Sequence, residues 1–277
     1  MAVNRPIDLE HLFQHYAADR LRAAGELDED AAEERAEALY AEWADAPCAA
    51  LEGCSPRAWF ARLNTPEALL EALTAYARAQ IEPPELLLER FDDLGAACAA
   101  PLEALARDEG EGAEVRAQAL GLLPGIDEAR ATRVAVDAVL AARESDAFCE
   151  LAAEILADRV DADIAARLLD GYDAAEDFAR ELILEVLCNF PGDGRVYERL
   201  LDMLKNRPEQ RAFAARLLGR YGDARAIEPL KALISMSDIT YYEYMELRNA
   251  VEALGGEIEH KREFYGDPDY EYLRDLE

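Results

Sequence analysis

The chain has 277 residues, 51% of them hydrophobic, and its 59 acidic and 29 basic side chains give a formal net charge of −30. Such a charge repels nucleic-acid phosphates and anionic lipid headgroups at long range, so we expect neither nucleic acid nor membrane as a partner. The first residues, MAVNRPIDLEHLFQHY, lack a secretory apolar core, and no apolar run is long enough to span a bilayer, which predicts a cytoplasmic protein.

The first 82 residues predict a small helical region of their own. Asp8 can cap a first helix, and Asp28 can begin a second one. Ser55-Pro56 and Thr65-Pro66 each place a capping side chain before a proline, which is typical of helix starts. We expect helices over residues 9–24, 28–44, 57–63 and 67–80.

A pair of prolines marks the end of this region, and two tryptophans lie before it. The run Glu82-Pro83-Pro84-Glu85 interrupts the helical pattern, and we place a domain boundary there. Upstream of it, Trp43 and Trp59 flank a loop that contains Gly53. Either tryptophan can pack in the core or serve as an exposed aromatic anchor for a partner.

The rest of the chain contains an internal sequence repeat. The segment GDGRVYERLLDML begins at Gly192, and GDARAIEPLKALI begins thirty residues later at Gly222. A fixed period of about 30 residues is typical of stacked helical hairpins. Stepping back from Pro229 by 30 to 33 residues gives five aligned units, with apolar side chains recurring at helical spacing. One residue after each anchor lie Leu102, Ala135, Leu168, Leu200 and Leu230.

Charged residues recur in the same register. Six positions before the anchor, four of the five units carry an acidic residue that can cap the second helix of the hairpin: Glu128, Asp161, Asp193 and Asp223. Two positions later lie Arg195 and Arg225, which we expect to reach carbonyls or acids of the adjacent unit. Each unit is therefore interpreted as a helix, a tight turn, an acidic cap and a second helix.

Residues 212–234, AFAARLLGRYGDARAIEPLKALI, are similar to the consensus of the HEAT family, especially its short version named after phycobilisome lyases. ELRNAVEALGG at 246–256 resembles the first helix of one more unit. The resemblance covers roughly residues 84–256 and implies an all-α fold, a right-handed α-solenoid of five to six hairpins, rather than a plain helical bundle. Three parts follow: a helical N-terminal region (1–82), the repeats (83–256) and an acidic, aromatic C-terminal part (257–277).

The sequence after residue 236 is rich in tyrosine. These aromatic side chains can cap the last repeat, whose apolar face would otherwise be exposed. They can also form a recognition patch, because tyrosine is enriched at binding hot spots. The aromatic residues are Tyr241, Tyr242, Tyr244, Phe264, Tyr265, Tyr270 and Tyr272.

No catalytic, cofactor or metal motif stands out. His11 and His15 have the i,i+4 spacing of a metal pair, but no glutamate follows His11 as a zincin motif requires. Phosphate-binding loops, dinucleotide fingerprints and nucleophile elbows are absent from the sequence. Deoxyhypusine hydroxylase, a HEAT-type iron enzyme, uses His-Glu dipeptides, and none occurs here. Bilin lyases share the repeat type, so a bilin or tetrapyrrole lyase, or its accessory, stays open as the alternative.

We therefore expect a non-catalytic scaffold that binds a basic protein or peptide. The second helices of the hairpins would line a concave face, although their charges also fit an ordinary solvated surface. The candidate partner-binding residues are Arg167, Asp170, Glu198, Arg199, Asp202, Glu228, Lys231, Tyr241, Tyr242 and Tyr244.

Overall fold

The structure is a computed structural model that describes residues 6–24, 29–258 and 262–274. These residues form helices and connecting loops without any strand, so the all-α prediction is confirmed. No helix among them is both long enough and apolar enough to cross a membrane. The chain divides into two compact units, residues 1–134 with 146–151 and residues 135–145 with 152–277.

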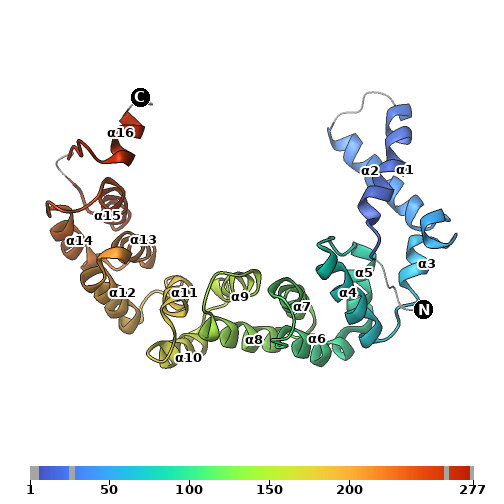
Figure 1. The fold of residues 1–277 in the computed structure, drawn as a ribbon, viewed down its shortest axis with the longest axis horizontal. Coiled ribbons are helices and arrows are strands. Elements are labelled where there is room, and N and C mark those ends of the chain that lie inside the picture. Colours follow the sequence, from blue (N-terminus) through green and yellow to red (C-terminus); the bar gives the residue numbers. More distant parts are fainter. Residues whose placement is uncertain (1–5, 25–28, 259–261, 275–277) are drawn as a thin grey trace. The chain divides into compact units, whose positions relative to one another are not determined.

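The first unit begins with two paired helices and continues through shorter ones (Figure 1). Helices α1 and α2 pack on each other, α3 packs on α5, and α7 packs on both α4 and α6. The α-helices of this part of the chain are α1 (Leu9–Ala24), α2 (Glu29–Ala44), α3 (Pro56–Phe60), α4 (Pro66–Ala79), α5 (Glu85–Leu94), α6 (Ala99–Ala106) and α7 (Ala113–Ile126). Short 3-10 turns, η1 (Ala49–Leu51) and η2 (Gly95–Cys98), precede α3 and α6.

The second unit consists of successive helix pairs. Helices α8 (Glu128–Ala141) and α9 (Ala147–Ala157) contribute residues to both units. Beyond them, α11, α13 and α15 form one row of this unit, beside a second row of α10, α12 and α14 (Figure 1). The remaining helices are α10 (Ala162–Tyr172), α11 (Asp177–Leu187), α12 (Gly194–Asn206), α13 (Arg211–Tyr221), α14 (Ile227–Ile234), α15 (Tyr241–Ala253) and α16 (Pro268–Arg274), with 3-10 turns η3 (Pro208–Gln210) and η4 (Ala224–Ala226).

The helix ends of the N-terminal region match their capping signals. Asp8 Oδ1 accepts a hydrogen bond from the His11 amide at 2.9 Å, and α1 spans the expected 9–24. Ser55 and Thr65 cap α3 and α4, each with a proline at the first helical position. α3 is shorter than expected and ends at Phe60. Asp28, expected to begin the second helix, lies outside the described residues.

The aligned repeat positions are buried as the register predicts. One residue after each anchor, all five side chains are fully buried: Leu102, Ala135, Leu168, Leu200 and Leu230. The position three residues before the anchor is buried in all five units as well, at Cys98, Ala131, Ile164, Val196 and Ala226. The periodic apolar pattern therefore supplies the core of each hairpin.

Two details of the repeat differ from expectation. The cap of α8 is Asp127 rather than Glu128: Asp127 Oδ1 accepts from the Arg130 amide at 3.0 Å, because Glu128 is already the first helical residue. Arg195 and Arg225 do not reach an acid of the adjacent unit. Each pairs with the aspartate two residues before it, Asp193 or Asp223, in its own turn.

Candidate functional site

The two arginines predicted to contact a partner are paired within the protein. Arg167 on α10 donates to Asp137 on α8 at 3.1 Å. Arg199 on α12 donates to Asp173, just after α10, at 2.8 Å, and its guanidinium lies 4.9 Å from the ring centroid of Tyr172. Both arginines therefore link successive second helices, which reduces their availability to a partner.

The acidic candidates remain on the surface. Asp170, Glu198 and Glu228 are exposed, and Asp202 is exposed while accepting from Asn206 Nδ2 at 2.7 Å. Lys231 is half-buried. These side chains belong to α10, α12 and α14, and their place on a concave face stays a prediction.

The predicted tyrosines divide between a cap and the surface. Tyr244 is only 3% exposed and contacts Phe264 at 5.0 Å between ring centroids, so its assignment as a partner contact is wrong. Tyr241 packs against Phe264 and Tyr270, at 5.6 and 5.2 Å. Tyr242 is 56% exposed, so its assignment as a partner contact stays a prediction. Most of these aromatic side chains therefore pack on one another at the N-terminal end of α15.

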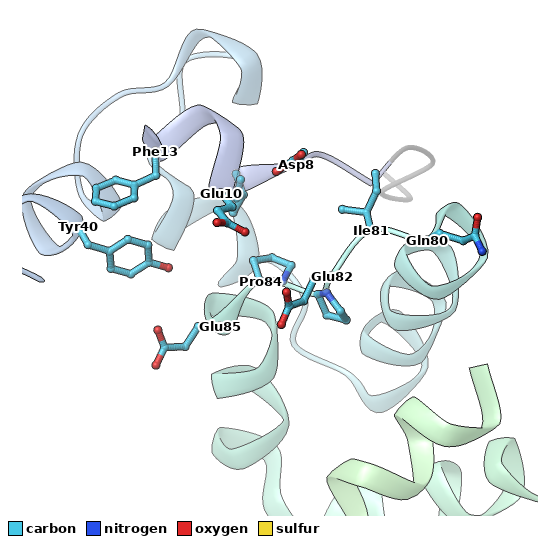
Figure 2. A pocket seen from close by; sticks show the side chains of 11 residues that line it. Asp8, Glu10, Phe13, Tyr40, Gln80, Ile81, Glu82, Pro84 and Glu85 are labelled. Atoms are coloured by element: carbon cyan, nitrogen blue, oxygen red, sulfur yellow. The ribbon is translucent and has the colours of Figure 1, made fainter. Parts of the chain in front are cut away.

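A cleft that no sequence pattern indicates lies in the first unit. Its cavity volume is about 390 Å³. Figure 2 shows α1 and α2 on one side and the segment between α4 and α5 on the other. The lining residues are Asp8, Leu9, Glu10, Phe13, Tyr40, Gln80, Ile81, Glu82, Pro83, Pro84 and Glu85.

The segment between α4 and α5 is held by its backbone. Gln80 ends α4 in the left-handed conformation, with φ of 55°, and its amide donates to the Ala77 carbonyl at 3.0 Å. The Ile81 amide donates to the Tyr76 carbonyl at 3.1 Å, which completes a Schellman motif. Pro83 and Pro84 follow, and their rings restrict the backbone. This wall of the cleft is therefore rigid.

The opposite wall is aromatic. The rings of Phe13 and Tyr40 meet edge to face with centroids 5.1 Å apart, and Tyr40 lies 5.8 Å from Trp43. Trp43 is 4% exposed, which confirms its place in the core. Trp59 is half-buried, with the Arg62 guanidinium 4.9 Å from its ring centroid. Packing behind Phe13 and Tyr40 holds both rings at the cleft (Figure 2).

The cleft carries negative charge from both walls. The carboxylates of the cleft, on Asp8, Glu10, Glu82 and Glu85, all belong to exposed residues, and no lysine or arginine is among the described residues that line it. Burial raises the pKa of Tyr40, and the nearby charges of Glu85 and Glu89 raise it further, while Arg57 lowers it. Carboxylates on both walls attract a cationic ligand, and the apolar stem of such a ligand can pack against the rings of Phe13 and Tyr40.

Among the described residues, no group of three or more His, Cys, Asp or Glu is arranged to hold a metal ion. His11 and His15 interact with each other instead: His15 Nδ1 is 2.8 Å from the His11 carbonyl. His260 lies outside the described residues.

Local motifs could not reveal the cleft because it joins distant segments. Asp8 and Glu10 lie more than 70 residues from Glu82 and Glu85 in the chain. The one available signal was the Glu82-Pro83-Pro84-Glu85 run, which predicted a break and not a binding surface. No protein-family model, curated protein sequence or solved structure matches this chain.

Proposed function

We propose that the protein is a non-catalytic recognition scaffold that binds a basic protein or peptide at the cleft of its first unit. One observation carries the proposal. Four carboxylates and the rings of Phe13 and Tyr40 line the same cavity, and none of the described residues that line it is basic. A cationic side chain entering it would meet opposite charge together with aromatic surface.

The charge of the whole chain supports a basic partner. At −30 the protein attracts cations at long range, which raises the rate at which a basic partner arrives. Exposed charge pairs contribute about 0.2–1 kcal/mol each. Three such contacts account for about a tenfold gain in affinity, because 1.4 kcal/mol corresponds to a factor of ten.

We further propose that residues 83–256 form a right-handed solenoid of HEAT-like hairpins and that the protein acts in the cytoplasm. The recurrent buried leucine or alanine one residue after each anchor supports the repeat. Five free cysteines fit a reducing compartment. The exposed acids of α10, α12 and α14 provide a second surface to which a basic partner could bind, and the experiment below separates the two surfaces.

The test is binding of a fluorescein-labelled, arginine-rich peptide to the full chain, followed by anisotropy at 50 and 300 mM NaCl. The cleft variant replaces Glu10, Glu82 and Glu85 with Gln. We expect it to bind about tenfold more weakly than the parent protein at 50 mM NaCl, since three charge contacts are removed. Affinity of the parent protein should fall as salt rises.

The matched control removes the same number of charges from the second surface, in the variant Glu198→Gln, Asp202→Asn, Glu228→Gln. It should change affinity less than twofold. If this control loses binding and the cleft variant keeps it, the binding surface is the row of second helices. If no basic peptide binds the parent protein at low salt, the proposed function is wrong.

A further inference from the structure

A second depression adjoins the acidic cleft. It has a cavity volume of about 580 Å³, and it shares Asp8 and Ile81 with the cleft as lining residues. Its other lining residues are all apolar: Pro6, Ile7, Leu12, Ala50 and Ala79. We call it the apolar groove. An acidic cavity and an apolar one thus lie side by side in the first unit.

The boundary between the two cavities is anchored by a buried tyrosine. The Tyr76 hydroxyl donates to the Ile7 carbonyl at 3.0 Å and accepts from the Ile7 amide at 3.3 Å. Tyr76 is 1% exposed, and this burial raises its pKa. A buried hydroxyl that lost these bonds would be left unsatisfied, so Ile7 and the adjoining Asp8 are held in place.

A fixed boundary means that both cavities exist before a ligand arrives. In a preformed site, the free-energy cost of ordering its residues on binding is smaller, so the affinity for the ligand is higher. The two cavities share Asp8 and Ile81, so together they suit one continuous ligand. In an extended peptide, residues i and i+2 point to the same side, about 7 Å apart.

We propose that the cleft and the apolar groove together bind one extended segment of the partner, in which an arginine and an aliphatic residue are two positions apart. The guanidinium would lie against Tyr40 and donate hydrogen bonds to the carboxylates of Glu10 and Glu82. The aliphatic side chain would cover Leu12 and Ala79. This inference rests on the proposed function, because it specifies the ligand of the same cleft.

Arginine fits this cleft better than lysine for geometric reasons. A guanidinium is planar, stacks on aromatic rings and donates to two carboxylates at once, whereas an ammonium is a strongly hydrated point charge. Phe13 and Tyr40 supply rings, and the carboxylates come from both walls of the cleft. We expect replacement of the arginine by lysine to weaken binding about threefold.

The test compares three labelled peptides with identical Gly-Ser flanks: Arg-Gly-Leu, and two peptides that each differ from it at one position, Arg-Gly-Ser and Gln-Gly-Leu. The full chain should bind the Arg-Gly-Leu peptide at least fivefold more tightly than the Arg-Gly-Ser peptide, and at least tenfold more tightly than the Gln-Gly-Leu peptide. The variant Ala79→Gln places a polar side chain at an exposed position of the apolar groove. It should reduce the leucine-to-serine preference below twofold.

Controls separate the possible failures. Ala58→Gln makes the same change at an exposed position of α3 that lines neither cavity, and it should leave the preference unchanged. Equal affinity for the leucine and serine peptides would overturn the two-cavity inference while leaving recognition of a basic ligand intact. Equal affinity for the arginine and glutamine peptides would overturn both proposals.

Discussion

The five cysteine thiols of the chain differ in how far solvent reaches them. Cys48 and Cys54 are half-exposed in the loop between α2 and α3, whereas Cys98, Cys149 and Cys188 are buried. Burial raises the pKa of the three buried thiols, and that of Cys188 rises to about 11. The thiolate is the reactive form, so burial and pKa both protect these three groups.

We predict that a thiol reagent such as DTNB at pH 8 labels two cysteines per chain quickly and all five after unfolding in urea. A raised pKa keeps the buried groups as neutral thiols at this pH, because the pH is below their folded-state pKa. Absorbance at 412 nm counts the labelled groups. The variant Cys48→Ser, Cys54→Ser should lose the fast phase entirely. Fast labelling of three or more groups would contradict the burial described here.

Side-chain partners show which residue-scale features can be predicted from sequence. The caps at Asp161, Asp193 and Asp223 involve amides two or three residues ahead, so local rules are sufficient. The bonds between Tyr76 and Ile7 join residues 69 positions apart and depend on how α4 packs. The neighbouring cleft is likewise assembled only in the fold, which is why its residues were missed.

At the scale of helices, two glycines occupy contrasting environments. A Cβ added at Gly219 in α13 would lie 3.0 Å from the Ala250 Cα and 3.2 Å from its Cβ, both in α15. A Cβ added at Gly121 in α7 would lie 3.6 Å from Leu151 Cδ2, an ordinary van der Waals contact. Gly219 therefore permits the close approach of α13 and α15, and Gly121 serves no such purpose.

We predict opposite effects for the same substitution at these two sites. Gly121→Ala should raise the free energy of unfolding by about 0.5–1 kcal/mol, because alanine has the higher helix propensity. Gly219→Ala should lower it by about 1–3 kcal/mol, because the backbone of α15 must move. Urea unfolding followed by circular dichroism at 222 nm measures both. Similar stabilisation by the two substitutions would mean that α13 and α15 are farther apart.

Helix boundaries were predictable where a cap and a proline coincide, as at Thr65-Pro66 before α4. The early end of α3 was not, because no local signal distinguishes a five-residue helix from a seven-residue one. The register of the repeats predicted which residues are buried, since that burial follows from helical periodicity alone. The face on which the second helices lie depends on the packing of successive hairpins, which periodicity does not determine, so the concave face stays a prediction.

At the scale of the whole molecule, the dominant feature is the imbalance between acidic and basic side chains. The 59 acidic side chains exceed the 29 basic ones by 30, which leaves a net charge of −30. Ion pairs such as Arg167–Asp137 and Arg199–Asp173 are solvent-exposed, and pairs of this kind contribute little individually. The predicted boundaries near residues 82 and 256 stay predictions, while contact between helices divides the chain within α8 and α9.

We predict that salt stabilises this protein. Repulsion among unpaired carboxylates favours the expanded unfolded chain, and salt screens it, since the Debye length falls from about 10 Å at 0.1 M to about 3 Å at 1 M. Salt also weakens the exposed ion pairs, but the excess of 30 acidic side chains over basic ones makes the reduced repulsion the larger effect. The urea midpoint should therefore rise between 0.05 and 1 M NaCl. Urea is the suitable denaturant because it carries no charge.

The charge variant Glu198→Gln, Asp202→Asn, Glu228→Gln provides the internal comparison for this salt effect. It removes three exposed carboxylates from α12 and α14, so its midpoint at low salt should exceed that of the parent and its increase with salt should be smaller. An increase of the same size in parent and variant would indicate that salt acts through general surface exclusion. A midpoint that falls with salt would show that the ion pairs between successive helices outweigh the repulsion.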